Sequence, residues 1–229
     1  MSHTSKNPVL KYTTSNLPSN PPVGTLAYDE TEDLYKSFNG SSWSKLEGSV
    51  FGSSSYFIHS DGRVDTVYGN ITASKFSNVS DLDAAVLGTS CSRIFSSAFW
   101  NSGLSKIVIP STVTDIAFGA FENCSFVSNG INLPEGLLTI GNSAFGSVTH
   151  ADLSLKIPST VTSVGLDILN SSNITSLDCY VEKIILNDTP SLTSSNVSTI
   201  HVRSTDATWT AGAGQSIGGK SGITVIKDL

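Results

Sequence analysis

The chain has 229 residues, and only 14% of them are charged, against about 25% in an average soluble domain. Ser, Thr, Asn and 19 Gly take their place, a composition typical of turn-rich β structure. The net charge of −6 argues against nucleic acid or an anionic membrane as a partner. The first ten residues lack an apolar core, and no apolar run approaches the roughly 20 residues of a membrane-spanning helix, so we expect neither a secretory signal nor membrane insertion.

Residues 1–48 are predicted to form a separate β module. A Pro-rich entry is followed by GTLAY, an acidic turn at 29–33, LYKSF, the turn Asn39-Gly40 and Trp43. Asn-Gly between apolar runs is a strong hairpin signal, so we expect a three-stranded meander. In residues 49–86, GSVFGSSS predicts a flexible linker, and Asp61-Gly62 predicts a hairpin that joins SYFIH to RVDTVY.

The central part of the chain repeats with a period of 24 residues. Three segments, at 106–121, 130–145 and 155–169, align on Pro110, Pro134 and Pro158. The pairs Ala120-Phe121, Ala144-Phe145 and Ile168-Leu169 keep the same spacing, as do Ile116, Ile140 and Val164. Three markers held in register across three copies indicate a true repeat, and such periods are typical of solenoids. We therefore predict a solenoid over residues 87–184.

The residues within one repeat unit predict the local structure of that unit. The β-branched run before Pro110 indicates a short strand, which ends there because proline cannot donate to a continuing ladder. The spacing from Ile116 to Phe121 suits one turn of helix with an apolar face. Stacked units should place Ile on Ile and Phe on Phe. The copy ending at Leu169 departs from the pattern, so we expect an irregular final coil, with strands in 185–229 capping the stack. The expected fold class is mainly β.

These residues resemble a known family. The segment IPSTVTDIAFGAFENCSF resembles the BspA-type leucine-rich repeats of bacterial surface proteins, adhesins and some phage proteins. The segment PPVGTLAYDET, with LY and NGSSW after it, is similar to a module of tailed-phage fibre and other virion proteins, and GRVDTVYGNITASKF is similar to fibre-shaft segments. Together these resemblances imply a non-enzymatic virion protein of tail-fibre, head-fibre or capsid-decoration type.

In that interpretation the N-terminal module binds other virion proteins, and the solenoid contacts a glycan or protein of the host surface. Homotrimers, as in fibres, and monomers are equally compatible with the residues. The alternative implied by the repeats is a bacterial cell-surface adhesin of BspA type. An intracellular scaffold or enzyme is the third possibility, and the sequence offers it neither a catalytic cluster nor a charged recognition stripe.

A candidate ligand surface follows from strand alternation. If Ile107 and Ile109 are buried, their neighbours along the strand face outward. The predicted surface consists of these neighbours and their equivalents in later copies: Lys106, Val108, Asn132, Ser154 and Lys156. A solvated face that binds nothing explains the same pattern. Trp100 and Trp209 could stack on sugar rings, but we expect each to fill a gap at an end of the stack.

Other motifs have simpler structural explanations, and we predict no catalytic residue, no cofactor and no metal site. Gly214–Ser221 matches a phosphate-binding loop, but the strand-like ITVI follows where a helix is required, so we expect a loop between capping strands. His59 with Asp61 and Asp65 could hold a cation weakly, although a polar hairpin turn explains the group. The acidic run at 29–33 lacks the pattern of a calcium loop. The three cysteines, Cys91, Cys124 and Cys179, are expected to be buried and unpaired.

Overall fold

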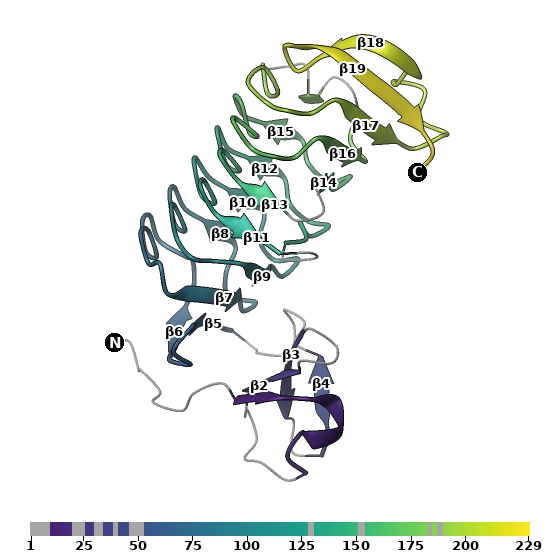
Figure 1. Cartoon of the computed structure of the whole chain (residues 1–229). Helices are drawn as coiled ribbons and strands as arrows, with labels where there is room; N and C mark the ends of the chain where they lie inside the picture. Colours follow the sequence, from purple (N-terminus) through teal and green to yellow (C-terminus); the bar gives the residue numbers. More distant parts are fainter. Residues whose placement is uncertain are drawn as a thin grey trace.

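The structure is a computed structural model that describes residues 10–19, 26–29, 34–38, 41–45, 53–127, 131–150, 154–182, 185–186 and 190–229. From residue 53 onward the chain winds into a β-solenoid of about six coils, as the repeat predicts (Figure 1). A small β-sheet module precedes the solenoid and lies beyond the end where β5 and β6 are found (Figure 1).

The N-terminal module is a four-stranded sheet in the order β1-β2-β3-β4. Strands β2 to β4 pair antiparallel, which confirms the predicted meander, and β1 adds a parallel strand at its edge. The indole Nε1–H of Trp43 donates to the carbonyl of Pro18 at 2.7 Å. The predicted turn Asn39-Gly40 lies outside the described residues. The elements are β1 (Leu10–Tyr12), the 3-10 helix η1 (Thr14–Asn16), β2 (Leu26–Asp29), β3 (Leu34–Phe38) and β4 (Trp43–Lys45).

A four-stranded sheet begins the solenoid. The predicted hairpin at Asp61-Gly62 is confirmed, because β5 and β6 pair antiparallel on either side of it. Strand β7 pairs antiparallel with β5, and β9 then pairs parallel with β7, which starts the coil-on-coil stacking. The strands, in the order β6-β5-β7-β9, are β6 (Val64–Tyr68), β5 (Ser54–His59), β7 (Leu82–Val86) and β9 (Lys106–Val108).

A second face of the solenoid is a ladder of two-residue parallel strands. It joins Ile94, Ile116, Ile140 and Val164 in register, and a bridge from Ile94 extends it back to Ile71. The regular stack thus includes residues within the segment predicted as linker and hairpin. The strands are β8 (Arg93–Ile94), β10 (Asp115–Ile116), β12 (Thr139–Ile140) and β15 (Ser163–Val164). A third face is formed by β11 (Ser125–Phe126) and β13 (Thr149–His150), which pair parallel.

The C-terminal sheet continues the first face and then closes it. Strands β14, β16, β17 and β19 are parallel, and β18 pairs antiparallel with β19 at the outer edge. The antiparallel strand β18 at the outer edge ends the stack of parallel strands and gives it the predicted β cap. The strands, in sheet order, are β14 (Ser154–Ile157), β16 (Ser176–Cys179), β17 (Thr199–Val202), β19 (Lys220–Lys227) and β18 (Gly212–Ile217).

The core consists of side-chain columns that run along the solenoid. Phe76, Phe99, Phe121 and Phe145 stack ring on ring, with successive centroids 5.7, 5.4 and 5.5 Å apart. Phe57 continues the stack, 4.0 Å from Phe76. Each aromatic pair contributes about 0.5–1.5 kcal/mol beyond the area that it buries. The prediction of Phe on Phe is therefore confirmed.

The corner that follows the second face is not the predicted helical turn. From Ile116 to Phe121 the chain makes successive turns, because Gly119 has φ +57° and its counterparts in other coils are also left-handed. A second left-handed position lies four residues later, at Asn101 and Asn123. Asn, Ser and Gly adopt this conformation at least cost, which explains their frequency in the repeat. The left-handed residues of the corner are Ser74, Asn78, Ser97, Asn101, Gly119, Asn123, Ser143, Ser147, Asp167 and Ser171.

Asparagine side chains join neighbouring corners. The amide Nδ2 of Asn101 donates to Oδ1 of Asn78 at 2.7 Å, and Asn123 donates to Asn101 in the same way. Backbone N–H groups at the same corner donate to the next coil, as Phe99 N does to Ala120 O at 2.9 Å. Each corner is thus fixed both by its own turns and by its neighbour.

The three cysteines are buried and unpaired, as predicted. Cys124 is fully buried, and its Sγ–H donates to the carbonyl of Phe99 at 3.1 Å. Burial raises the pKa of the Cys124 thiol to about 11 and that of Cys179 to about 12. These thiols are therefore protonated apolar fillers at neutral pH.

Candidate functional site

The outward face of the C-terminal sheet carries a row of polar side chains. Leu155, Leu177 and Ile200 point into the core, so the residues beside them in β14, β16 and β17 face outward. The parallel register places Lys156, Asp178 and His201 side by side. His201 Nδ1 lies 2.9 Å from Oδ1 of Asp228, which follows β19.

The predicted ligand surface is divided between two sheets. Lys106 and Val108 belong to β9 in the N-terminal sheet of the solenoid and are half-buried. Ser154 and Lys156 belong to β14 in the C-terminal sheet, where Lys156 is exposed. Asn132 is exposed beside Ile131, which bridges to Ile107. The structure thus brings the five residues onto one side of the coils but gathers further polar groups only around Lys156.

Tyr180 lies at the centre of these groups. The Nζ of Lys156 is 4.8 Å from the centroid of the Tyr180 ring, and the guanidinium carbon of Arg203 is 5.7 Å from it. Arg203 Nη2 also donates to the Tyr180 carbonyl at 2.6 Å. Lys156 is held from its other side by Glu135, with Nζ and Oε1 3.5 Å apart. A cation over an aromatic face is attracted to it, so the ring and both cations hold one another in place.

Sequence reasoning missed Tyr180 and Arg203 because they follow the three aligned copies. A signal for them exists, since the buried positions Leu155, Leu177 and Ile200 continue the repeat at spacings of 22 and 23. Extending the register in this way would have placed Tyr180 and Arg203 one coil apart on the same face.

A cleft of about 610 Å³ opens beside Tyr180. It lies where the second face ends, because β15 is the last strand of its ladder while the first face continues through β16, β17 and β19. Successive coils supply its walls. The residues that line it include Val161, Thr162, Tyr180, Glu182, Arg203 and Asp206.

Two of the residues that line the cleft, Val181 and Asp206, are hydrogen-bonded to residues that precede β18 or end β19. Trp209 is buried, and its Nε1–H donates to the carbonyl of Val181 at 2.9 Å. It fills a gap near the C-terminal end of the stack, as predicted, whereas the same prediction was wrong for Trp100, which is 37% exposed. Lys227 Nζ donates to the carbonyl of Asp206 at 2.7 Å. The hydroxyl of Thr208 donates to the carboxylate of Asp206 and holds the pKa of that group below its usual value.

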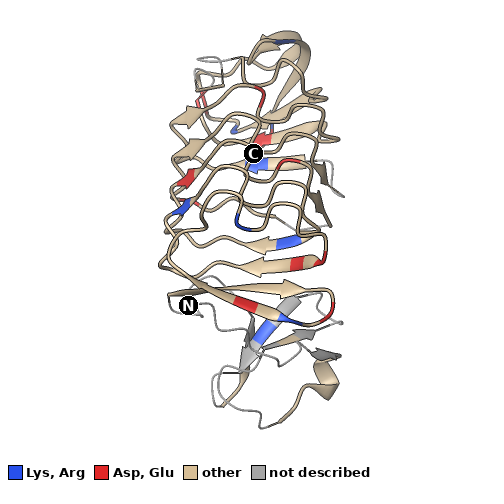
Figure 2. Ribbon diagram, turned by 90° about the vertical axis from the view of Figure 1, so that its left-hand side faces the viewer, with Lys and Arg blue, Asp and Glu red and all other residues tan. Residues whose placement is uncertain are grey.

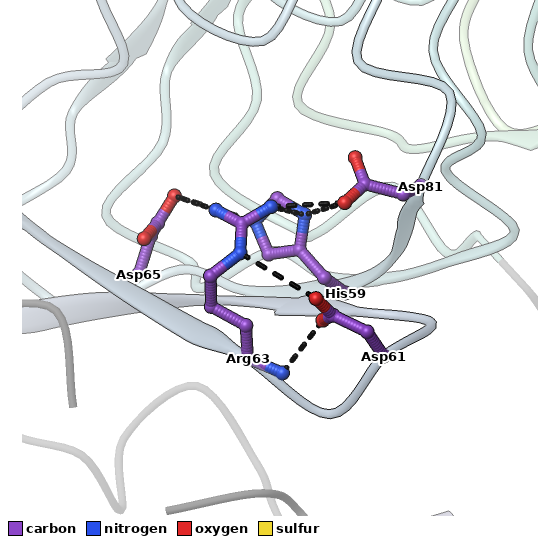
Figure 3. A network of polar contacts seen from close by, with 5 residues as sticks. All are labelled: His59, Asp61, Arg63, Asp65 and Asp81. Atoms are coloured by element: carbon purple, nitrogen blue, oxygen red, sulfur yellow. Dashed lines mark hydrogen bonds and ion pairs between the residues drawn. The ribbon is translucent and has the colours of Figure 1, made fainter. Parts of the chain in front are cut away.

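A second polar cluster lies on the β5–β6 hairpin at the other end of the solenoid. Figure 3 shows Arg63 reaching between carboxylates, with Nη1 3.3 Å from Asp65 Oδ2 and Nη2 2.9 Å from Asp81 Oδ2. The buried ring of His59 lies 3.3 Å from Asp65 and 3.2 Å from Asp81. Burial tends to raise the pKa of Asp81, but hydrogen bonds from His59 and Arg63 outweigh it and lower this pKa.

This cluster corresponds to the weak cation site considered for His59, Asp61 and Asp65. The guanidinium of Arg63 stands among the carboxylates, and the backbone N–H of Arg63 donates to Asp61 Oδ1 at 2.9 Å (Figure 3). Such an arrangement is a polar hairpin turn closed by an internal cation. Among the described residues, no group of three or more His, Cys, Asp or Glu side chains could hold a metal ion.

The glycine-rich motif at 214–221 spans a β-hairpin. Gly218 and Gly219, at φ +55° and +80°, form the turn between β18 and β19. A strand follows the motif instead of the helix that binds phosphate, in agreement with the expected loop between capping strands. In the acidic run at 29–33, Asp29 ends β2, and residues 30–33 lie outside the described residues. In the part of the chain that the structure describes, no helix is long and apolar enough to cross a membrane.

The fold and its repeating columns define a leucine-rich-repeat type of solenoid. The comparison with protein families agrees: six copies of the BspA type leucine rich repeat region match residues 23–128 and 125–208. The chain belongs to this family. Searches of curated proteins and of solved structures gave no match. The family match supports the repeats but not the resemblance of the N-terminal module to virion proteins, which stays a prediction.

Proposed function

We propose that this chain is a non-enzymatic adhesin of BspA type, displayed on a bacterial cell surface. The observation that carries the proposal is the family match, whose six copies extend over most of the chain. This match favours the adhesin over the virion protein that the resemblance of the N-terminal module implies. The N-terminal module is then an attachment or spacer unit instead of a virion anchor.

The architecture suits adhesion for a physical reason. Each coil contacts only its neighbours, so stacking produces an extended surface of fixed geometry on which outward side chains stand in rows. Charged residues are scattered along the coils instead of gathering into one basic surface (Figure 2). Such a surface favours hydrogen-bonding partners such as glycans or polar protein faces over nucleic acid or anionic lipid.

An immunogold experiment tests the location. Antibody raised against residues 53–229 is applied to intact source cells and to virus particles purified from the same culture, with a gene-deletion strain as the control. We expect label on wild-type cells and none on the deletion strain. Label on particles with none on cells would contradict the adhesin and return the virion interpretation.

An adhesion assay tests the activity itself. Beads coated with the purified chain are applied to the surface that the source organism colonises, and beads coated with albumin serve as the control. The adhesin proposal predicts retention of the first beads under flow. Equal retention of the two kinds of bead contradicts it.

A further inference from the structure

The cleft beside Tyr180 is lined by polar and charged side chains that solvent reaches. The guanidinium of Arg203 is exposed, donates one hydrogen bond, to the Tyr180 carbonyl, and attracts the Asp206 carboxylate electrostatically. Glu182 is exposed and Tyr180 is half-buried, and both line the cleft. Arginine carries five N–H donors in a planar fork, so Arg203 keeps most of its capacity for a ligand.

The charges of these side chains limit the chemical classes of ligand that the cleft can bind. One guanidinium faces a cleft that also holds the carboxylates of Glu182 and Asp206. A compact dianion such as phosphate is repelled by the two carboxylates. A molecule with one carboxylate and several hydroxyls satisfies all of these groups, because its carboxylate accepts from the guanidinium while its hydroxyls donate to Glu182 and Asp206.

We propose that this cleft binds an acidic sugar residue, a uronic or sialic acid in a surface glycan. The inference rests on the proposed adhesin function and names its ligand class. Arg203 receives the sugar carboxylate in bidentate fashion, and Glu182 accepts from ring hydroxyls. Tyr180 contributes its hydroxyl and the edge of a ring whose orientation Lys156 and Arg203 fix. The volume of about 610 Å³ lies within the range of small-molecule sites.

A matched pair of sugars tests the proposal. Methyl α-glucuronide and methyl α-glucoside differ only at C6, where the first has a carboxylate and the second a hydroxymethyl group. Each is titrated into the isotope-labelled full chain and followed by NMR. We expect the glucuronide to shift the amide resonances of Tyr180, Arg203 and Thr205. We expect the glucoside to bind roughly tenfold more weakly or worse, because it lacks the charged acceptor.

Two arginine variants complete the test. Arg203→Gln should weaken glucuronide binding roughly tenfold or more, since a charge-assisted contact is lost. Arg203 is exposed, so its replacement leaves the core intact. Arg93→Gln removes the same charge from the second face, where Arg93 pairs with Asp115, and should leave binding unchanged. No shift with glucuronide, or equal shifts with inorganic phosphate at the same amides, overturns the proposal.

The bead assay separates this proposal from the adhesin itself. If beads coated with the Arg203→Gln variant are retained as well as wild-type beads, the adhesin proposal is supported and the proposed role of the cleft is contradicted. If wild-type beads are not retained although glucuronide binds at Arg203, the adhesin proposal is contradicted and the ligand proposed for the cleft is supported.

Discussion

The coils of residues 71–175 and those of residues 176–209 both contribute strands to the first face of the solenoid. They differ on the second face, whose ladder of strands includes only the first set of coils. In the first region the left-handed corner residues recur along the coils, the phenylalanine column runs to Phe145, and the ladder of the second face continues to Val164. In the second region the ladder of the second face has ended at β15, and the cleft opens at that point. Strict repetition therefore produces a closed stack, and departure from it produces the concave surface that a ligand needs.

The largest expected effect comes from the phenylalanine column. Phe121→Ala should lower the free energy of unfolding by about 3–5 kcal/mol, because it leaves a cavity between two stacked rings. Chemical denaturation measures this loss. The matched control is Phe118→Ala, three residues away, whose side chain is 53% exposed and whose removal should cost less than about 1 kcal/mol. Similar losses in the two variants would contradict the column as the source of stability.

The next effect appears only in alkaline solution. Cys124 has a pKa of about 11 in the folded chain against 9.0 in the reference state, so its thiolate is disfavoured by folding. The stabilisation is complete below pH 9 and is lost as pH rises from 9 toward 11. We expect the denaturation midpoint to fall over this range, and to fall less steeply in Cys124→Ala. An identical pH slope in this variant would show that the thiol does not contribute.

A smaller effect is expected at the left-handed corner. Asn101→Ala should lose about 1–2 kcal/mol, because alanine pays the steric cost of φ +52° and the bond to Asn78 is removed. Asn101→Gly keeps the backbone conformation accessible and should lose less. Thermal melting of both variants ranks them. A greater loss with glycine than with alanine would show that backbone strain is not what selects asparagine here.

The smallest effect is expected at the hairpin cluster. The lowered pKa of Asp81 means that its carboxylate stabilises the folded chain above its ordinary pKa, near 4, and that this contribution is lost as pH falls through the folded value. The side chain is half-exposed, so solvent weakens the effect. Asp81→Asn should flatten only slightly the decline of the melting temperature as pH falls below the ordinary carboxylate pKa. A steeper decline in this variant would contradict the assigned direction.

The sequence was sufficient for the stacking, because the markers Phe121 and Phe145, or Ile116 and Ile140, keep one spacing and must therefore meet. It was insufficient for the corner, where apolar residues four and one apart fit a helical turn and a tight left-handed turn equally well. Only the positive φ of residues such as Gly119 and Asn123 distinguishes the two.

For the candidate site, Lys156 followed from strand alternation, but its partners did not. Tyr180 and Arg203 depend on coils whose apolar markers had changed identity, from Phe145 to Leu169 and Leu192, so the repeat faded before the cleft began. The cleft itself depends on where β15 ends its ladder, which no local pattern encodes.

The reversed strand β18 has a consequence for the size of the molecule. Register shifts interrupt its pairing with β19, and Gly212 and Gly214 adopt positive φ within it. Such an edge does not offer the regular row of donors and acceptors that a further strand requires. Axial growth by strand addition therefore stops at this end. The length of the solenoid is therefore set by the number of repeats in the sequence, because each repeat adds one layer of about 4.8 Å.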